Sequence, residues 1–169
     1  MKTINRFESA FSVLLVTVIS VCCICSANAA QENNRLGLGF AMGAPSGLNA
    51  KVWLSHINAL DITAGWSYWN TWVKADYLWH DWSVIQANED MDIPLYYGVG
   101  GFAGGLKDDT GMGPEAVIGL DMMLKRAPFD FFVEAGPAVQ LIGNTGVYIH
   151  ASLGARYYFN YGNRQGRTK

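Results

Sequence analysis

The sequence predicts an all-β protein, an eight-stranded antiparallel transmembrane β-barrel with a polar, filled lumen. Three observations lead to this fold class. After Ala30 there is no run of 18 apolar residues, so no transmembrane helix is available. This part of the chain also lacks a convincing 3.6-residue apolar period. Apolar and polar residues instead alternate through segments separated by Gly, Pro, Asn, Ser and Asp, which is typical of strands joined by turns.

The first segment has the pattern of a cleaved signal peptide. Lys2 and Arg6 precede an apolar run that is shorter than the roughly 20 residues of a membrane-spanning helix. Ala27 and Ala29 then supply the small residues that a signal peptidase reads, although an uncleaved anchor is the alternative. We therefore expect a signal peptide at 1–29, a β-barrel domain at 30–159 and a basic periplasmic tail at 160–169.

The exported part lacks the residues that several function classes need. Cys22, Cys23 and Cys25 all lie in the signal segment, which excludes a disulfide framework, a thiolate metal site and a cysteine nucleophile. Without residues 1–29, ten basic and thirteen acidic side chains remain. A net charge of −3 gives no indication of a nucleic-acid partner.

Eight alternating segments are the predicted strands, and turn residues or charges separate them. The predicted strands are 35–42, 47–54, 59–68, 71–82, 94–103, 114–124, 129–141 and 146–159. The connection at 83–93 is the longest and falls on the periplasmic side, whereas 104–113 is the one long connection on the outer side. No second domain is expected.

The composition of the two strand faces separates two kinds of barrel. In 59–68, Leu60 and Ile62 share one face and Asp61 and Thr63 the other. A soluble lipocalin-like barrel would bury the apolar face, whereas a membrane barrel turns it toward lipid. The polar face is rich in glycine, which suits the narrow lumen of an eight-stranded barrel. These glycines are Gly37, Gly39, Gly65, Gly98, Gly100, Gly119, Gly136 and Gly154.

Charges and aromatic residues also favour the membrane barrel. The charged residues of the strands fall on the polar face, and a Lys or Arg on the lipid face would cost about 2–4 kcal/mol at the midplane. We expect two aromatic girdles at the membrane boundaries. The outer girdle would hold Trp66, Tyr68, Trp69 and Trp72, and the inner one Trp79, Trp82, Tyr97, Phe129, Tyr157 and Phe159.

Several blocks of the sequence resemble a family of small uncharacterised bacterial outer-membrane β-barrels, of the outer-membrane protein A-like type. The blocks are 43–53, 75–80, 94–101, 127–134 and 154–159. The resemblance covers nearly the whole exported chain and implies the fold and an outer-membrane location, but it brings no catalytic residues. The last strand also resembles the signal read by the barrel-assembly machinery, although ten residues follow Phe159.

Inward charges form the main candidate site. Isolated buried charges cost several kcal/mol, so we expect a network of ion pairs across the lumen. A structural polar core is the favoured interpretation, and a gated ion path or proton-sensitive plug is the alternative. The predicted network consists of Lys51, Asp61, Lys74, Asp76, Glu115, Asp121, Glu134 and Arg156.

Two weaker patterns suggest chemistry at a histidine. His150 and Ser152 resemble the His-x-Ser pair of outer-membrane lipid A deacylases, with Glu134 completing a trial catalytic set. His80 and His150 could share a metal with Asp76, but they have no ligand spacing signature. We therefore expect no cofactor and no metal.

The sequence predicts a monomeric, non-catalytic protein of the outer membrane with a structural role in the envelope or a role in surface interactions. Its expected partners are outer-membrane lipid, lipopolysaccharide and, during insertion, the barrel-assembly machinery. The alternatives are a lipid A acyl-ester hydrolase, a narrow channel or a carrier of a small apolar ligand.

Overall fold

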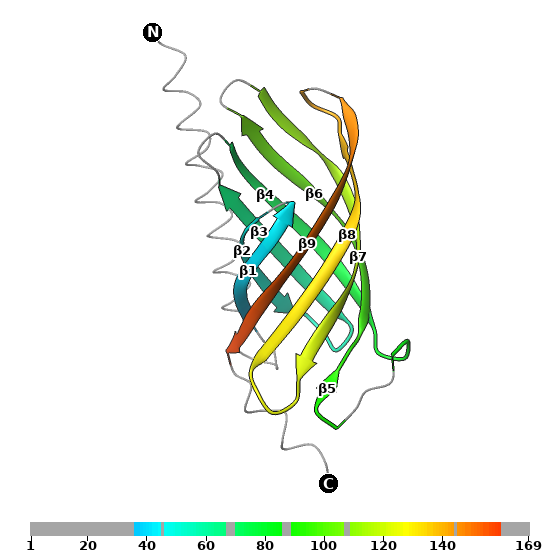
Figure 1. The fold of residues 1–169 in the computed structure, drawn as a ribbon. Helices are drawn as coiled ribbons and strands as arrows, with labels where there is room; N and C mark the ends of the chain where they lie inside the picture. Colours follow the sequence, from blue (N-terminus) through cyan, green and yellow to red (C-terminus); the bar gives the residue numbers. More distant parts are fainter. Residues whose placement is uncertain are drawn as a thin grey trace. The chain divides into compact units, whose positions relative to one another are not determined.

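A computed structural model describes residues 36–44, 46–66, 70–85, 89–106, 109–143 and 145–159, and in this part of the chain it has nine strands (Figure 1). The two units of the chain are Met1–Asn34 and Arg35–Lys169, and only the second contains described residues. The predicted signal peptide and basic tail lie outside the described residues. The strands are β1 (Leu36–Ala44), β2 (Gly47–Trp53), β3 (Asn58–Trp66), β4 (Asn70–Asp81), β5 (Met91–Asp92), β6 (Leu95–Leu106), β7 (Asp109–Leu124), β8 (Phe129–Gln140) and β9 (Gly146–Phe159).

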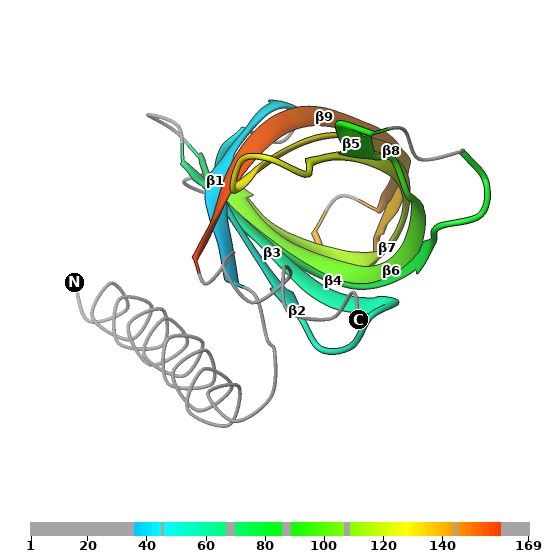
Figure 2. The ribbon, with the colours of Figure 1, turned by 90° about the horizontal axis from the view of Figure 1, so that it is seen from below.

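Eight of these strands close into a barrel. Neighbours along the chain pair in antiparallel fashion, β4 pairs with β6, and β9 returns to pair with β1 along the whole of β1. The pairing of β7 with β8 completes the ring, which Figure 2 shows from below. The short strand β5 adds only to β7 and is not part of the ring. The predicted eight-stranded antiparallel barrel is therefore confirmed.

In the eight strands of the barrel, buried residues largely alternate with more exposed ones, and the buried face carries the charged side chains. In β8, Asp130, Phe132 and Glu134 are buried, whereas Phe131 and Val133 are about half exposed. This alternation follows from the two-residue period of a strand, which sends successive side chains to opposite faces. The predicted polar, filled lumen is confirmed.

The lower end of the barrel, where β2 and β9 end in Figure 1, has an apolar seal. The indole of Trp53 donates a hydrogen bond to the Tyr158 hydroxyl at 3.2 Å. Trp82 packs on this cluster from the connection that follows β4. The buried members of the seal are Trp53, Ala59, Leu78, Tyr96, Val117, Met123 and Tyr158.

The wall of the barrel has unequal height. β1, β2 and β3 have 9, 7 and 9 residues, whereas β6, β7, β8 and β9 have 12 to 16. The pairing of β1 with β9 ends at Ala44 and Ala151, although β9 begins five residues earlier, at Gly146. Figure 1 shows the β6–β7 and β8–β9 hairpins rising above the tip of β1.

The prediction of a long outer loop at 104–113 was wrong. β6 runs to Leu106 and β7 starts at Asp109, so most of that segment is a strand hairpin. Its glycines gave the appearance of a turn, but Gly104 pairs with Gly111 across the hairpin. Neighbouring groups fill the places of the missing side chains, namely Trp72 at Gly104 and Gln140 at Gly111. The connection predicted at 83–93 likewise contains a short strand, β5.

The described residues contain no helix that could cross a membrane.

A glycine in β8 gives a test of the barrel packing. The pairing of β7 and β8 is interrupted at Gly136 and Pro137, since proline has no N–H to donate. A methyl group on Gly136 would overlap the Ala116 carbonyl. Gly136→Ala should therefore lower the free energy of unfolding by about 1–3 kcal/mol, the usual range for overpacking, measured by urea titration of the refolded protein.

Gly146→Ala is the matched control for this substitution. Its methyl group would meet the end of the Tyr148 side chain at 3.1 Å, and that flexible ring can move. This variant should stay within about 0.5 kcal/mol of the wild type. Equal losses in the two variants would contradict the packing described for β8.

Candidate functional site

The lumen carries the polar chemistry of the molecule. All eight members of the predicted ion-pair network lie inside the barrel, each at most 7% exposed. Asp130, which the predicted network omitted, is also inside and fully buried. Alternation alone places Asp130 on the same face as Glu134, so the sequence pattern contained the signal for it. Arg35, at the start of the first predicted strand, lies outside the described residues.

Arg156 of β9 is the centre of a lower network. Its Nη1 atom lies 3.4 Å from Asp130 Oδ2 and 3.6 Å from Asp121 Oδ1. Its Nη2 atom lies 3.5 Å from Asp61 Oδ2. The guanidinium also lies 3.9 Å from the centre of the Phe132 ring. One cation thus contacts carboxylates from three strands, β3, β7 and β8.

Lys51 and His80 reach the same network from β2 and β4. The Lys51 ammonium pairs with Asp121 Oδ2 and lies 4.9 Å from the centres of the Trp53 and Tyr96 rings. His80 Nε2 lies 3.2 Å from the same carboxylate oxygen, and Nδ1 lies 3.1 Å from the Ile57 carbonyl. Both ring nitrogens of His80 therefore face acceptors.

A second network lies higher in the lumen around Lys74 of β4. Its ammonium lies 2.7 Å from Glu134 Oε1 and 3.0 Å from Asp76 Oδ2. Glu134 also accepts hydrogen bonds from the Tyr96 hydroxyl at 3.0 Å and from the Ser152 hydroxyl at 3.0 Å. Charge-assisted bonds of this kind are the stronger class of hydrogen bond. The network fixes β4, β6, β8 and β9 relative to one another.

Glu115 has a weaker partner than the other lumen carboxylates. His150 Nε2 lies 3.7 Å from Glu115 Oε2 and 3.2 Å from the Ala116 carbonyl oxygen. No Lys or Arg of the described residues forms an ion pair with Glu115.

The trial catalytic set is only partly brought together. Ser152 donates its hydrogen to Glu134, while the His150 ring faces the Ala116 carbonyl and Glu115. Within the described ranges no hydrogen bond joins His150 to Ser152, so the histidine does not act on this hydroxyl in the observed geometry.

The described residues also lack a cluster of three or more His, Cys, Asp or Glu side chains that could hold a metal ion. His80 contacts Asp121 in the lower network, whereas His150 contacts Glu115 above it. The structure does not bring the two histidines and Asp76 together in one ligand set.

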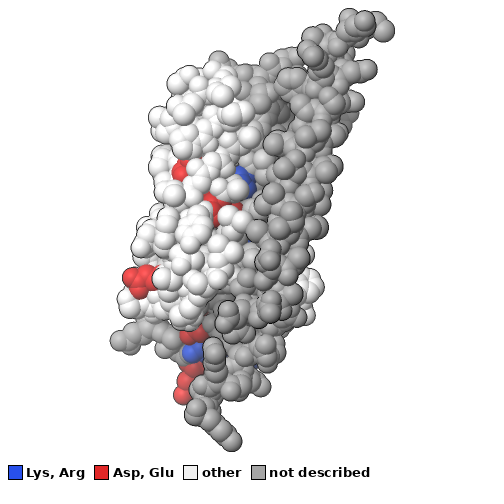
Figure 3. Space-filling view, turned by 180° about the vertical axis from the view of Figure 1, so that it is seen from behind, with Lys and Arg blue, Asp and Glu red and all other residues white. Residues whose placement is uncertain are grey.

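The outside of the barrel is apolar. Large aliphatic side chains that project outward include Leu153 at 54% exposure and Ile149 at 83%. In Figure 3 most of the described surface on the rear face belongs to residues other than Lys, Arg, Asp and Glu. Aromatic rings gather outside the lower end, where Trp79 stacks on Tyr97 and Tyr157 contacts Phe129 and Phe159.

Two tryptophans differ from their predicted girdle positions. Trp72 fills the space beside Gly65 and Gly104 and thus lies on the lumen side of its strand. Trp82 stacks on His56 with ring centres 5.0 Å apart and packs against the apolar seal instead of projecting outward. Of the other predicted outer-girdle residues, Tyr68 and Trp69 and the side chain of Trp66 lie outside the described part.

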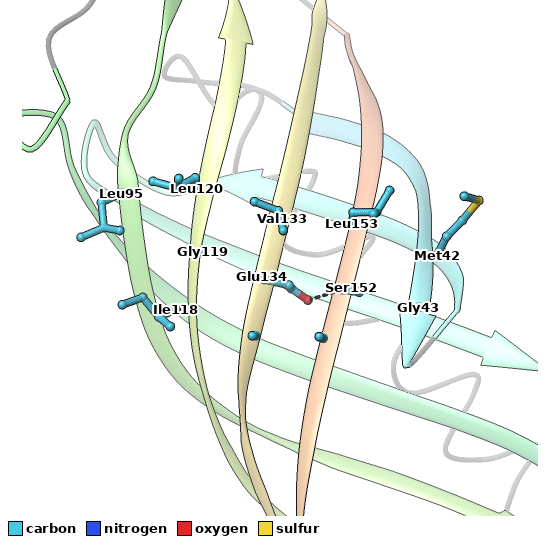
Figure 4. Close-up of a pocket in the computed structure, with 12 residues that line it drawn as sticks. Met42, Gly43, Leu95, Ile118, Gly119, Leu120, Val133, Glu134, Ser152 and Leu153 are labelled. Carbon is cyan, nitrogen blue, oxygen red and sulfur yellow. Dashed lines mark hydrogen bonds between the residues drawn. The ribbon is translucent and has the colours of Figure 1, made fainter.

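A shallow depression of about 430 Å³ crosses the outer wall (Figure 4). It runs from Leu95 of β6 to Met42 of β1, and small residues such as Ala135 and Ala151 form its floor. The Glu134–Ser152 hydrogen bond of the upper lumen network lies beside it, as the dashed line in Figure 4 shows. The sequence analysis did not identify this depression, because it depends on the alignment of five strands.

Comparisons with known proteins give one structural similarity. Neither a family model nor a curated protein matches the chain. Among solved structures, the N-terminal β-barrel domain of Pseudomonas aeruginosa OprF is similar, with 16% sequence identity and a TM-score of 0.45. The match covers 75% of this chain and 96% of that chain. The fold of the present chain is established by its own strand pairing.

Lys74 gives a test of the upper network. Lys74→Met keeps the length of the side chain but leaves Asp76 and Glu134 buried without their shared cation. Removal of one partner from a buried ion pair costs about 3–5 kcal/mol, so we expect a loss of this size in the free energy of unfolding.

Arg126→Gln is the matched control because Arg126 forms an ion pair with Asp90 while its side chain is 80% exposed. An exposed pair contributes at most about 1 kcal/mol. Urea unfolding of both variants in detergent micelles measures the difference. A Lys74→Met variant as stable as Arg126→Gln would contradict the role given to Lys74.

Proposed function

We propose that this chain is an integral β-barrel protein of the bacterial outer membrane, with a closed lumen and a structural or surface-interaction role in the cell envelope. The observation that carries the proposal is the distribution of polarity. Nine charged side chains lie inside the closed barrel, whereas the outward side chains are mainly aliphatic and aromatic.

An apolar exterior of this kind is unfavourable in water. Soluble monomers rarely expose contiguous apolar patches larger than a few hundred Å². Here apolar side chains project outward on successive strands, as Leu38, Leu48 and Val99 do on β1, β2 and β6. In contact with lipid these apolar side chains are no longer exposed to water. The closed ring of strands also leaves few backbone groups without a hydrogen bond, as a membrane-spanning structure requires.

The lengths of the strands and the positions of the aromatic side chains also support a membrane location. A strand crosses the hydrocarbon region with about 9–11 residues, and β4, β6, β7, β8 and β9 all reach at least that length. The aromatic side chains outside the lower end, including Trp79, Tyr97 and Tyr157, match one interfacial girdle. The signal-peptide pattern and the family resemblance of the sequence favour the outer membrane, with lipid, lipopolysaccharide and the assembly machinery as partners.

The contents of the lumen favour a closed barrel over an open pore. Lys51, Lys74 and Arg156 contact carboxylates from opposite walls, and the apolar seal closes the lower end. An eight-stranded barrel is only wide enough for side chains to fill it. We therefore favour a structural barrel over a channel, and the separation of His150 from Ser152 gives the hydrolase alternative no support.

Adjacent positions on β9 test the membrane location. Leu153 is 54% exposed and points outward, whereas Ser152 is 5% exposed and points inward. Since the exported chain has no cysteine, a single cysteine at either position can carry a nitroxide spin label. In liposomes the label at 153 should be relaxed by oxygen and protected from a water-soluble nickel chelate. Strong relaxation of that label by the nickel chelate would reject a lipid-facing wall, and the label at 152 is the matched control for the inner face.

Conductance in planar bilayers tests the closed lumen. The wild-type protein should add no steady conductance, because buried ion pairs and the apolar seal fill the barrel. Lys74→Met should remain silent as well, since Arg156 and the seal stay in place. Stable open-channel steps from the wild type would replace the structural proposal with a channel.

A further inference from the structure

Two carboxylates face each other across a glycine in the upper lumen. In the register of the sheet, Asp76 of β4 pairs with Gly100 of β6, and Gly100 pairs with Glu115 of β7. A side chain on Gly100 would collide with Asp76 Oδ1, so this oxygen points into the space that the glycine leaves empty. Glu115 borders the same space from the other side, because it pairs with Gly100 from β7.

Each of these two carboxylates has an oxygen that lacks a hydrogen-bond donor among the described residues. Asp76 is 1% exposed and Glu115 is 7% exposed. Asp76 Oδ1 and Glu115 Oε1 are buried without a hydrogen-bond partner among the described residues. Two ionised carboxylates offer only acceptors to each other, and like charges that share a buried site repel.

The neighbouring charged groups do not supply the missing donor. Lys74 on β4 binds Asp76 through Oδ2 and is shared with Glu134 of β8. Asp61 on β3 is the next residue in the register and is held by Arg156 and by the Asn49 amide, with distances of 3.5 and 2.6 Å.

His150 of β9 is the remaining titratable neighbour. Its Nε2 atom is 3.2 Å from the Ala116 carbonyl, which a neutral ring satisfies with one N–H. A charged ring would place a second N–H at Nδ1, and this buried atom has no partner in the described part of the chain. Unpaired buried donors are unfavourable, so the geometry favours a neutral His150.

The charge of the whole lumen also requires protons. Its described interior holds six carboxyl groups, Asp61, Asp76, Glu115, Asp121, Asp130 and Glu134, against the three cations Lys51, Lys74 and Arg156. Even a proton on His80, whose ring nitrogens both face acceptors, would leave more carboxyl groups than cations in this interior. Uncompensated charge in such an interior costs several kcal/mol.

We propose that Asp76 and Glu115 form a proton-binding site across Gly100, in which one proton is held between the two carboxyl groups in the folded barrel at neutral pH. The site goes beyond the proposed envelope role. The proton-binding site requires only the closed barrel and not a particular role in the envelope. An experiment that rejects the envelope role therefore leaves the proton-binding site intact, and the reverse also holds.

Infrared spectroscopy of the refolded protein detects the proton directly. A protonated carboxyl group has a C=O stretching band that a carboxylate lacks. At pH 7 the wild type should show this band, and Glu115→Gln and Asp76→Asn should each lose about one group of its intensity. The second variant keeps the test available if the first does not fold. Asp130→Asn, in the lower network, and His150→Asn should both retain the band.

The pH dependence of unfolding gives the second readout. An unfolded glutamate releases its proton near pH 4.3, whereas the folded pair retains it at higher pH. The folded state then binds one more proton, so the unfolding equilibrium constant should rise by up to about tenfold per pH unit above this value. Glu115→Gln should remove this part of the slope, because its amide donates to Asp76 at every pH.

Three results would overturn the proposal. The first is the absence of a protonated-carboxyl band in the wild type, and the second is a band that persists unchanged in both Glu115→Gln and Asp76→Asn. The third is a barrel without the band that loses stability when sodium or magnesium is removed, which would assign the site to a metal cation.

Discussion

Arg156 contacts three carboxylates in the centre of the barrel, and each of them comes from a different strand. A guanidinium is charged under all ordinary conditions and cannot be left without partners in a closed interior. Its burial is therefore possible only when β3, β7, β8 and β9 surround it together. The favourable interaction exists only in the closed ring, so closure and charge pairing stabilise each other.

Other features of the lumen follow from this constraint. The cations have long side chains that cross the barrel, and the glycines on the inner face leave space for them. Gly100 shows the relation most clearly, since its missing side chain leaves space for the Asp76 carboxylate. Polar groups that would be unfavourable one at a time are tolerated as a network in which most atoms find partners. The lower end is filled differently, by the apolar seal of Trp53, Tyr158 and their neighbours, which the Lys51 ammonium contacts through the Trp53 ring.

The sequence predicts the fold and the inner face well, because both depend on a two-residue period. Asp61, Lys74 and Glu134 were placed inside by alternation alone. Alternation could not predict which inward charges form ion pairs. Lys51 and Asp121, for example, are 70 residues apart in the sequence and meet only through the stagger of the closed sheet. Trp72 was misplaced because composition suggested a girdle, whereas strand parity placed it inside. The glycines of the β6–β7 hairpin were interpreted as a loop, because the local sequence does not show what fills the space beside them. Trp72 and Gln140, which fill it, come from other strands.

The pairing of β1 with β9 joins the two ends of the barrel sequence. Contacts between distant segments form slowly, because the chain loses much conformational freedom before they become favourable. Until β9 is in place, Arg156 has no enclosed site and its three carboxylates remain hydrated. The final step of folding therefore combines the joining of the last seam with the dehydration of the charged interior. The kinetic barrier to forming this barrel should lie at that step, and its reversal should limit the rate of unfolding.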